Sequence, residues 1–349
     1  MPILDDHHDR KHPVETDGAW SESYYFNAYD SVVDSGFFSR IGIRPNEGTM
    51  DASLSVWLPN GDVAHLRAER PQKKMIDTHL EVGSIVYDCV TPMKEWRLRG
   101  QGSAVVQRLG ANALAAADGR ATTDLDVDVT FRAVTPAIGV DGQGGEKHGA
   151  AGVTSASVGK GHFEQAGAWS GSISVDGTTH RFTDARGNRD KSWGPRRWGG
   201  PKMWRWFSIN IGDDVAFGGI RIDTEVGNLH RGWVWRDGTA TSVQEWRMRT
   251  ELADDNLTQR VVHLTVLDKA GRAHELRGDL LRVAPLARPG RTGGTIVNEA
   301  SPDGPTKGGR ARGSQSTCTS SMKTADRGRR SSRRQPPSDA ASPLRLSGR

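Results

Sequence analysis

The feature that most constrains this chain is a two-residue alternation of apolar and polar side chains in short runs, each ended by a turn dipeptide. Ser53 to Leu58 alternates, Asn60-Gly61 follows, and an apolar run returns from Val63. A period of two is typical of strands, and Asn-Gly favours a hairpin because both residues tolerate positive φ. Helical periodicity is nearly absent. The pattern predicts an all-β protein built from antiparallel hairpins.

Similar turns follow the runs that end near Val175, Trp235 and Leu267. Many short strands at this spacing favour a sandwich or barrel, and 349 residues are enough for two such domains. A glycine-rich stretch without aromatic residues, 135–160, is expected to connect them. We therefore predict one β-domain over 17–159 and a second over 160–299.

The net charge of +5 is produced by the end of the chain. Residues 300–349 hold 11 Lys and Arg against 3 acidic residues, whereas the rest of the chain holds 36 against 39. The same segment lacks Phe, Trp, Tyr, Ile and Val, so it cannot bury enough apolar surface to offset its ordering entropy. We expect a disordered basic tail over 300–349, and we do not interpret its charge as a nucleic-acid-binding function.

Composition also limits the location and the cofactors of this chain. No apolar run is long enough for a membrane helix, although transient contact with a membrane surface stays open. The polar N-terminus, with His7 and His8, resembles no secretory signal, which favours a cytoplasmic protein. Two distant cysteines and the absence of phosphate-loop or zinc spacings predict no cofactor and no metal site.

Tryptophan is concentrated in one part of the sequence. Eight of the 11 tryptophans lie between Trp169 and Trp246. Alternate positions such as Trp204 and Trp206 place both rings on one face of a strand. Indole rings suit an apolar or cationic small molecule, so an aromatic-lined cavity and a simple core are both open interpretations.

The densest polar run in the predicted domains is 187–196, which contains Asn188, Arg189, Asp190, Trp193 and Arg196. Neighbouring cations would keep the Asp190 carboxylate ionised, whereas burial against indole rings would favour a protonated acid. A structural Asp–Arg pair within a tight loop is the competing interpretation.

His162 and Glu164 are two residues apart in an alternating run, so they share one face of a predicted strand. They suit a proton-handling pair, and a hydrogen-bonded pair inside a barrel is equally open. A metal site is not expected because no third ligand is clustered with them.

Four blocks of this sequence together resemble the superfamily of AttH and carotenoid 1,2-hydratase (hydroxyneurosporene synthase). The blocks are 20–26, 40–48, 162–165 and 189–196, the last followed by Trp204-Arg205-Trp206. The resemblance implies two tandem lipocalin-like antiparallel β-barrels with a ligand cavity. It also implies that the acid of the hydratases, which protonates a carbon–carbon double bond, falls on Asp190. Two residues depart from the hydratase pattern, because Asn188 replaces a tyrosine and Glu164 replaces a tryptophan.

The resemblance also bears on the tail, because relatives of this type continue after the Asn298-Glu299 position with a further strand. Codons chosen for 301–307 and 313–327 can encode such a strand in a shifted frame. A frameshift near Glu299 is therefore a hypothesis that the nucleotide sequence tests.

Two functions follow from these observations. The first is binding of an isoprenoid, steroid-like or other hydrophobic small molecule, with hydration, isomerisation or cyclisation of a C=C bond. The expected catalytic residues are Asp190, His162 and Glu164; the expected ligand-binding residues are Trp193, Trp204, Trp206, Trp235, Asn188, Arg189 and Arg196. The second is a non-catalytic lipocalin-like carrier of the same kind of ligand.

Overall fold

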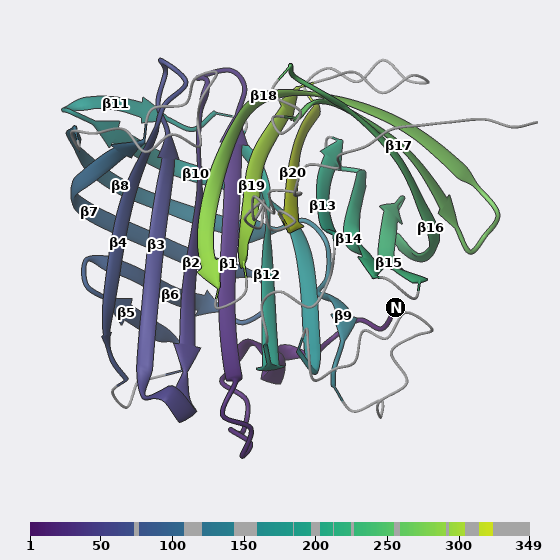
Figure 1. Ribbon diagram of the computed structural model, residues 1–349, viewed down its shortest axis with the longest axis horizontal. Coiled ribbons are helices and arrows are strands. Elements are labelled where there is room, and N and C mark those ends of the chain that lie inside the picture. Colours follow the sequence, from purple (N-terminus) through teal and green to yellow (C-terminus); the bar gives the residue numbers. More distant parts are fainter. Residues whose placement is uncertain are drawn as a thin grey trace, which may run out of the picture.

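The computed structural model describes residues 1–72, 77–107, 121–142, 159–183, 185–196, 203–211, 213–224, 227–254, 259–290, 293–303 and 314–323. The side chains of 203, 204, 224 and of all residues after 280 lie outside this description. Strands dominate the described chain and fall into two curled antiparallel sheets (Figure 1).

The first sheet occupies the part of the chain before residue 196. Its strands are β1 (Trp20–Asp30), β2 (Ser35–Arg44), β3 (Thr49–Trp57), β4 (Val63–Pro71), β5 (His79–Val82), β6 (Ile85–Thr91), β7 (Glu95–Gln107), β8 (Thr122–Ala133), β9 (Ile138–Val140), β10 (Gly161–Val175), β11 (Thr178–Arg181) and β12 (Ala185–Pro195). β8 pairs with β7 on one side and with β10 on the other. This pairing closes a ring through β10, β12, β1, β2, β3, β4, β7 and β8, which is the first barrel.

The second sheet is a closed barrel whose strands follow one another in sequence order. Its strands are β13 (Met203–Ile211), β14 (Val215–Thr224), β15 (Gly227–Arg236), β16 (Thr239–Leu252), β17 (Gln259–Asp268), β18 (Ala273–Gly290), β19 (Gly293–Asp303) and β20 (Ser314–Lys323). β20 pairs with both β19 and β13, and so completes the ring. The fold is therefore the predicted pair of antiparallel lipocalin-like barrels.

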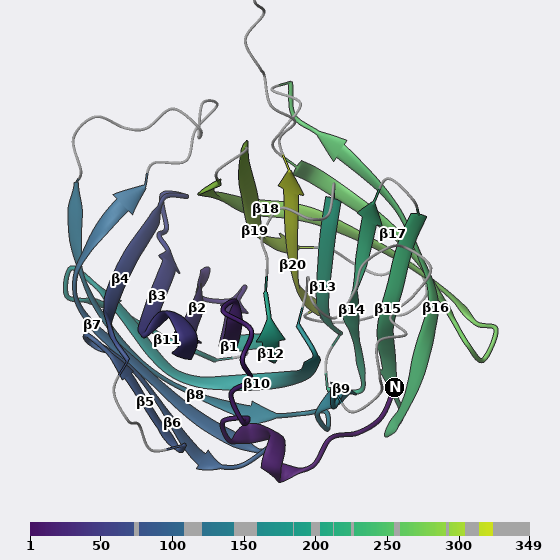
Figure 2. The ribbon, with the colours of Figure 1, turned by 60° about the horizontal axis from the view of Figure 1, so that its bottom comes forward.

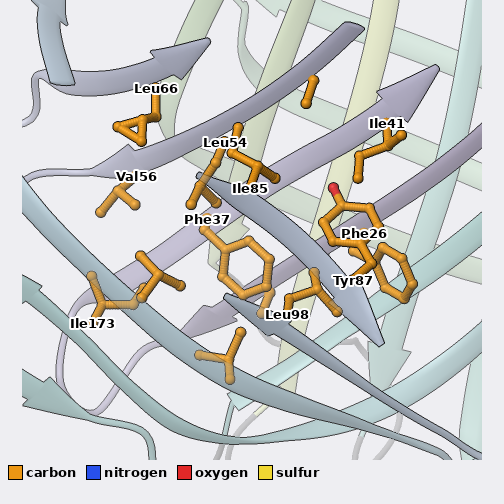
Figure 3. Packing of buried hydrophobic residues seen from close by; sticks show 14 of the residues in the cluster. Phe26, Phe37, Ile41, Leu54, Val56, Leu66, Ile85, Tyr87, Leu98 and Ile173 are labelled. Carbon is orange, nitrogen blue, oxygen red and sulfur yellow. The ribbon is translucent and has the colours of Figure 1, made fainter. Parts of the chain in front are cut away.

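Alternate residues of the first barrel point inward and form its core. The largest cluster includes Phe26 of β1, Phe37 of β2 and Tyr87 of β6, which are all almost completely buried (Figure 3). A smaller cluster fills the second barrel around Phe207 and Trp246, whose rings stack 4.7 Å apart. Each barrel thus has its own apolar interior, as the period-two pattern requires.

The predicted hairpins are present, and two of their turns have two successive positive φ values, whereas at 60–61 and 270–271 only the glycine has a positive φ. Asp176 and Gly177 have φ values of 46° and 79°, and Asp237 and Gly238 have values of 50° and 75°. Two successive positive φ values define the hairpin turn whose twist matches that of its strands. These turns connect β10 to β11 and β15 to β16.

The N-terminal segment lies against both barrels. The 3₁₀ helices are η1 (Asp6–Asp9) within this segment and η2 (Pro45–Glu47) after β2. The amino group of Met1 donates a hydrogen bond to Ser242 of β16, and Ile3 bridges to Ile138 of β9. The chain end accordingly lies beside β15 and β16 in both views (Figure 2).

Strand pairing differs from the predicted organisation in two respects. β10 and β12 pair with β1, β8 and each other, so the change of sheet falls between Pro195 and Met203 rather than at 159/160. The pairing partners are far apart in sequence, and no local signal reveals them. Within the segment predicted to be disordered, 300–303 and 314–323 are in strands, whereas 304–313 and 324–349 lie outside the described residues. Across the described chain, no helix is long and apolar enough to span a membrane.

Candidate functional site between the two barrels

Strand β12 divides the predicted site residues between two faces. Arg189 and Trp193 point into the first barrel, where they contact the N-terminal segment. Asn188 and Asp190 belong to the opposite set of alternating positions, which faces outward from the first barrel. The ligand-binding set predicted from the sequence is therefore not one cluster.

Arg189 is locked inside the first barrel. Its guanidinium donates to both carboxylate oxygens of Asp9, at 2.7 and 3.1 Å, and to Gln165 at 2.6 Å. It also lies over the rings of Trp96 and Phe163. Burial alone would raise the pKa of Asp9, but the charge and hydrogen bonds of Arg189, the hydrogen bond from the Met93 N–H and the charge of Lys191 together lower it. Arg189 therefore holds the N-terminal segment in place, and its contacts leave it little freedom to bind a ligand.

Trp193 has a comparable place on the same inner face. Its ring stacks on that of His12, with centroids 3.7 Å apart and planes at 7°, and only 4% of the residue is exposed. Next to it, Lys191 donates to the backbone oxygen of His8 and pairs with Glu22 at 2.9 Å. These interactions fix the N-terminal segment rather than form part of the site around Asp190.

On the outer face, His162 and Glu164 of β10 form a hydrogen-bonded pair. His162 Nε2 and Glu164 Oε1 are 3.0 Å apart, and the same carboxylate oxygen accepts a hydrogen bond from Trp206 Nε1 at 2.6 Å. Trp206 belongs to β13 of the second barrel, so this contact joins the two barrels. The predicted pair thus exists, but it faces the second barrel instead of the interior of the first.

Glu164 is nearly buried at 3% exposure, and its second oxygen, Oε2, has no hydrogen-bond partner among the described residues. A Cβ atom added to Gly218 of β14 would lie 2.2 Å from this oxygen. Only glycine at 218 leaves room for the carboxylate at this contact between the barrels. The sequence pair Gly218-Gly219 is the one local signal of this close approach.

Asp190 lies between two strands that bring polar side chains to the same face. It is opposite Glu164 of β10 and opposite Tyr25 of β1. Its carboxylate accepts no hydrogen bond from the described residues and is half-buried. Burial raises the pKa of Asp190 to about 6, and the charge of Glu164 adds to the rise against the opposing effects of His162 and Arg196. Of the two effects weighed from the sequence, desolvation is therefore the larger.

The pKa of His162 is raised, so its imidazole is protonated more often than that of an ordinary histidine. Burial on its own lowers its pKa, but the hydrogen bond to Glu164 and the charges of Asp190 and Glu164 raise it above the ordinary value. The His162 side chain nevertheless keeps 33% of its surface accessible. Asp190 and His162 thus combine desolvation with partly exposed surface.

Two further residues of this face, Tyr25 and Asn27, were not predicted from the sequence. Tyr25 packs edge-on against Trp206, with ring centroids 5.6 Å apart. Asn27 accepts a hydrogen bond from the backbone N–H of Asn188, and the side-chain nitrogens of both asparagines are buried without a partner among the described residues. β1 and β12 are adjacent only in the folded barrel, so nothing in the sequence near Asp190 points to these residues.

The remaining predicted residues have different positions. Trp235 packs in a cluster with Trp233, Ile138 and Ala166, which is beside the outer face of β10. Arg196 affects both Asp190 and His162 through its charge. The side chain of Trp204 lies outside the described part of the chain.

The architecture defines a class: a two-barrel, lipocalin-like β-protein whose polar side chains gather where the first barrel meets the second. A family profile identifies the group more narrowly. The chain belongs to the family described as the domain of unknown function DUF7064, whose profile matches residues 5–310. A search of curated proteins gave no match.

Solved structures with the same fold include three that cover most of the chain. A protein assigned as AttH from Nitrosomonas europaea has a TM-score of 0.59 at 12% identity, covering 87% of this chain and 92% of that one. Kievitone hydratase from Nectria haematococca has a TM-score of 0.54 at 12% sequence identity, and the match covers 86% of this chain and 89% of the hydratase. CghA has a TM-score of 0.51 at 15% sequence identity, and the match covers 88% of this chain and 89% of CghA. The similarity confirms the fold expected from the resemblance to AttH and the hydratases.

Proposed function

We propose that this protein binds a hydrophobic small molecule where the two barrels meet and that Asp190 protonates a C=C bond of that molecule. The observation that carries the proposal is the carboxyl group of Asp190, which is half-buried, accepts no described hydrogen bond and has a pKa raised to about 6. A carboxylic acid that is partly neutral near physiological pH is a general acid. The hydratase named among the structures of the same fold supports this reaction class.

The proposed step is a proton transfer from Asp190 to an alkene carbon. The O–H bond of protonated Asp190 breaks, a C–H bond forms at one alkene carbon, and the other carbon becomes a carbocation. Water then adds to the cation for hydration, or a neighbouring C–H proton leaves for isomerisation. The pair of His162 and Glu164 is placed to accept the second proton, because its imidazole lies beside the carboxylate of Asp190.

Aromatic rings at the same place suit the cationic intermediate. Trp206 and Tyr25 pack edge-on beside the polar group, and the faces of such rings attract a positive charge. The unpartnered amide nitrogens of Asn27 and Asn188 are donors for an oxygen atom on the ligand. We therefore expect a mostly apolar ligand that carries a hydroxyl or carbonyl group.

Binding at this position is tested with farnesol and progesterone as probes of tryptophan fluorescence. Trp206→Phe is expected to weaken binding of the better probe about tenfold, because the indole N–H to Glu164 and part of the ring contact are lost. Trp246→Phe is the matched control, since that ring is packed inside the second barrel. Weaker binding in the control alone would place the ligand inside the second barrel and contradict the proposal.

Formation of a product distinguishes an enzyme from a non-catalytic carrier. Wild-type protein incubated in D₂O with an unsaturated probe is expected to place deuterium on carbon, which mass spectrometry detects. Binding with no deuterium in any of a panel of isoprenoid and steroid alkenes would favour the non-catalytic carrier.

A further inference from the structure

The N-terminal segment contains a group of metal-ligating side chains outside the site between the barrels. One ligand atom from each of Asp5, His7 and His8 lies within 4.8 Å of the others. Asp5 contacts the ring of His7 directly, and His8 is buried while the other two are exposed. The sequence Asp5-Asp6-His7-His8 places these groups on a single turn, η1, that ends against the first barrel.

His12 brings a third ring nitrogen beside His8. Its Nε2 lies 3.1 Å from Nδ1 of His8, close to the roughly 3.3 Å expected between two nitrogens bound to one tetrahedral Zn²⁺. The opposite nitrogen of the ring, Nδ1, is 2.9 Å from the carboxylate of Glu22. A carboxylate behind a ligand histidine fixes its tautomer and directs the free nitrogen to the metal.

Glu22, which contacts the Nδ1 side of the His12 ring, is itself held in place by a buried ion pair within the first barrel. Glu22 is buried at 3% exposure and pairs with Lys191 at 2.9 Å. Lys191 in turn donates to the backbone oxygens of His8 and of Arg10, which lies between the two histidines in the sequence. His8 and His12 are therefore held by residues of β1 and β12.

We propose that Asp5, His7, His8 and His12 bind one divalent transition-metal ion of the Zn²⁺ type. Two or three imidazoles and one carboxylate are the ligand set that Zn²⁺ accepts in tetrahedral sites. The ion clamps residues 5–12 onto the open end of the first barrel, where Asp9 and Lys191 already make buried contacts. The site is separate from Asp190, which lies on the other face of β12.

The test uses the full chain without an affinity tag, first stripped with EDTA and then titrated with Zn²⁺ by calorimetry. One Zn²⁺ per chain is expected, and His7→Ala is expected to weaken its affinity at least tenfold. His7 is exposed, with 64% of its side chain accessible, so this variant is expected to fold normally. His79→Ala is the control, because His79 also contacts two carboxylates at the surface but has no described histidine neighbour.

Two further measurements make the outcome definite. Saturating Zn²⁺ is expected to raise the melting temperature of the wild type and of His79→Ala but not of His7→Ala, because a ligand stabilises only the state that binds it. Co²⁺ is expected to give the intense visible bands of a tetrahedral site. Equal, weak binding by all three proteins would overturn the proposal and leave Asp5 as the cap of η1.

Discussion

Replacing Arg189 by methionine is expected to lower the free energy of unfolding by about 3–5 kcal/mol. Arg189 and Asp9 each expose only 1% of their side chains, so the substitution leaves the Asp9 carboxylate buried without its counter-charge. The same change removes the hydrogen bond to Gln165 and the contacts with Trp96 and Phe163. Urea unfolding measures the loss.

The matched control is Arg97→Met, which removes an exposed arginine from an ion pair on the first barrel. Arg97 and Asp128 are 2.8 Å apart, but about half of each side chain is accessible. Exposed pairs contribute about 0.2–1 kcal/mol, so the control is expected to lose no more than that. Similar losses in the two variants would mean that Arg189 does not anchor the N-terminal segment.

Replacing Asp190 by asparagine is expected to reduce turnover about 10²–10⁴-fold, the usual contribution of a general acid. Asparagine has the same shape, and it removes a charge that burial disfavours, so folding and ligand binding are expected to persist. Deuterium incorporation into the isoprenoid and steroid panel measures turnover, and tryptophan fluorescence measures binding.

Asp128→Asn serves as the control for this experiment, because it makes the same change at an exposed carboxylate on β8. It is expected to leave both readouts unchanged. If Asp190→Asn turned over substrate as fast as this control, Asp190 would not be the acid.

The local parts of the fold were predictable because short-range rules determine them. Alternation gave the strands, and dipeptides such as Asp176-Gly177 gave turns with the expected positive φ values. The change of sheet after Pro195 was not predictable, since β12 pairs with β1 across most of the first barrel's sequence. β20 is not predicted because its sequence lacks the β-branched and aromatic residues typical of strands, apart from two threonines.

The site was predictable only in part. Alternation along 188–193 places Asp190 on the face opposite Arg189 and Trp193, so the expected ligand-binding residues lie on two faces of β12. Tyr25 and Asn27 could not be predicted as site residues. They lie beside Asp190 and Asn188 only through the pairing register of β1 with β12, and neither strand's sequence determines that register. The burial of His8 and Asp9 depends on Lys191 and Arg189, which follow some 180 positions later.

The central claim, that Asp190 is held as a partly neutral acid between the barrels, is tested most directly by measuring its pKa. Carboxyl carbons of aspartate labelled with ¹³C are titrated by NMR, and the resonance missing from Asp190→Asn is assigned to Asp190. The prediction is a midpoint of about 6. A midpoint near the ordinary aspartate value of about 3.9 would contradict the claim, because the group would be fully ionised at neutral pH.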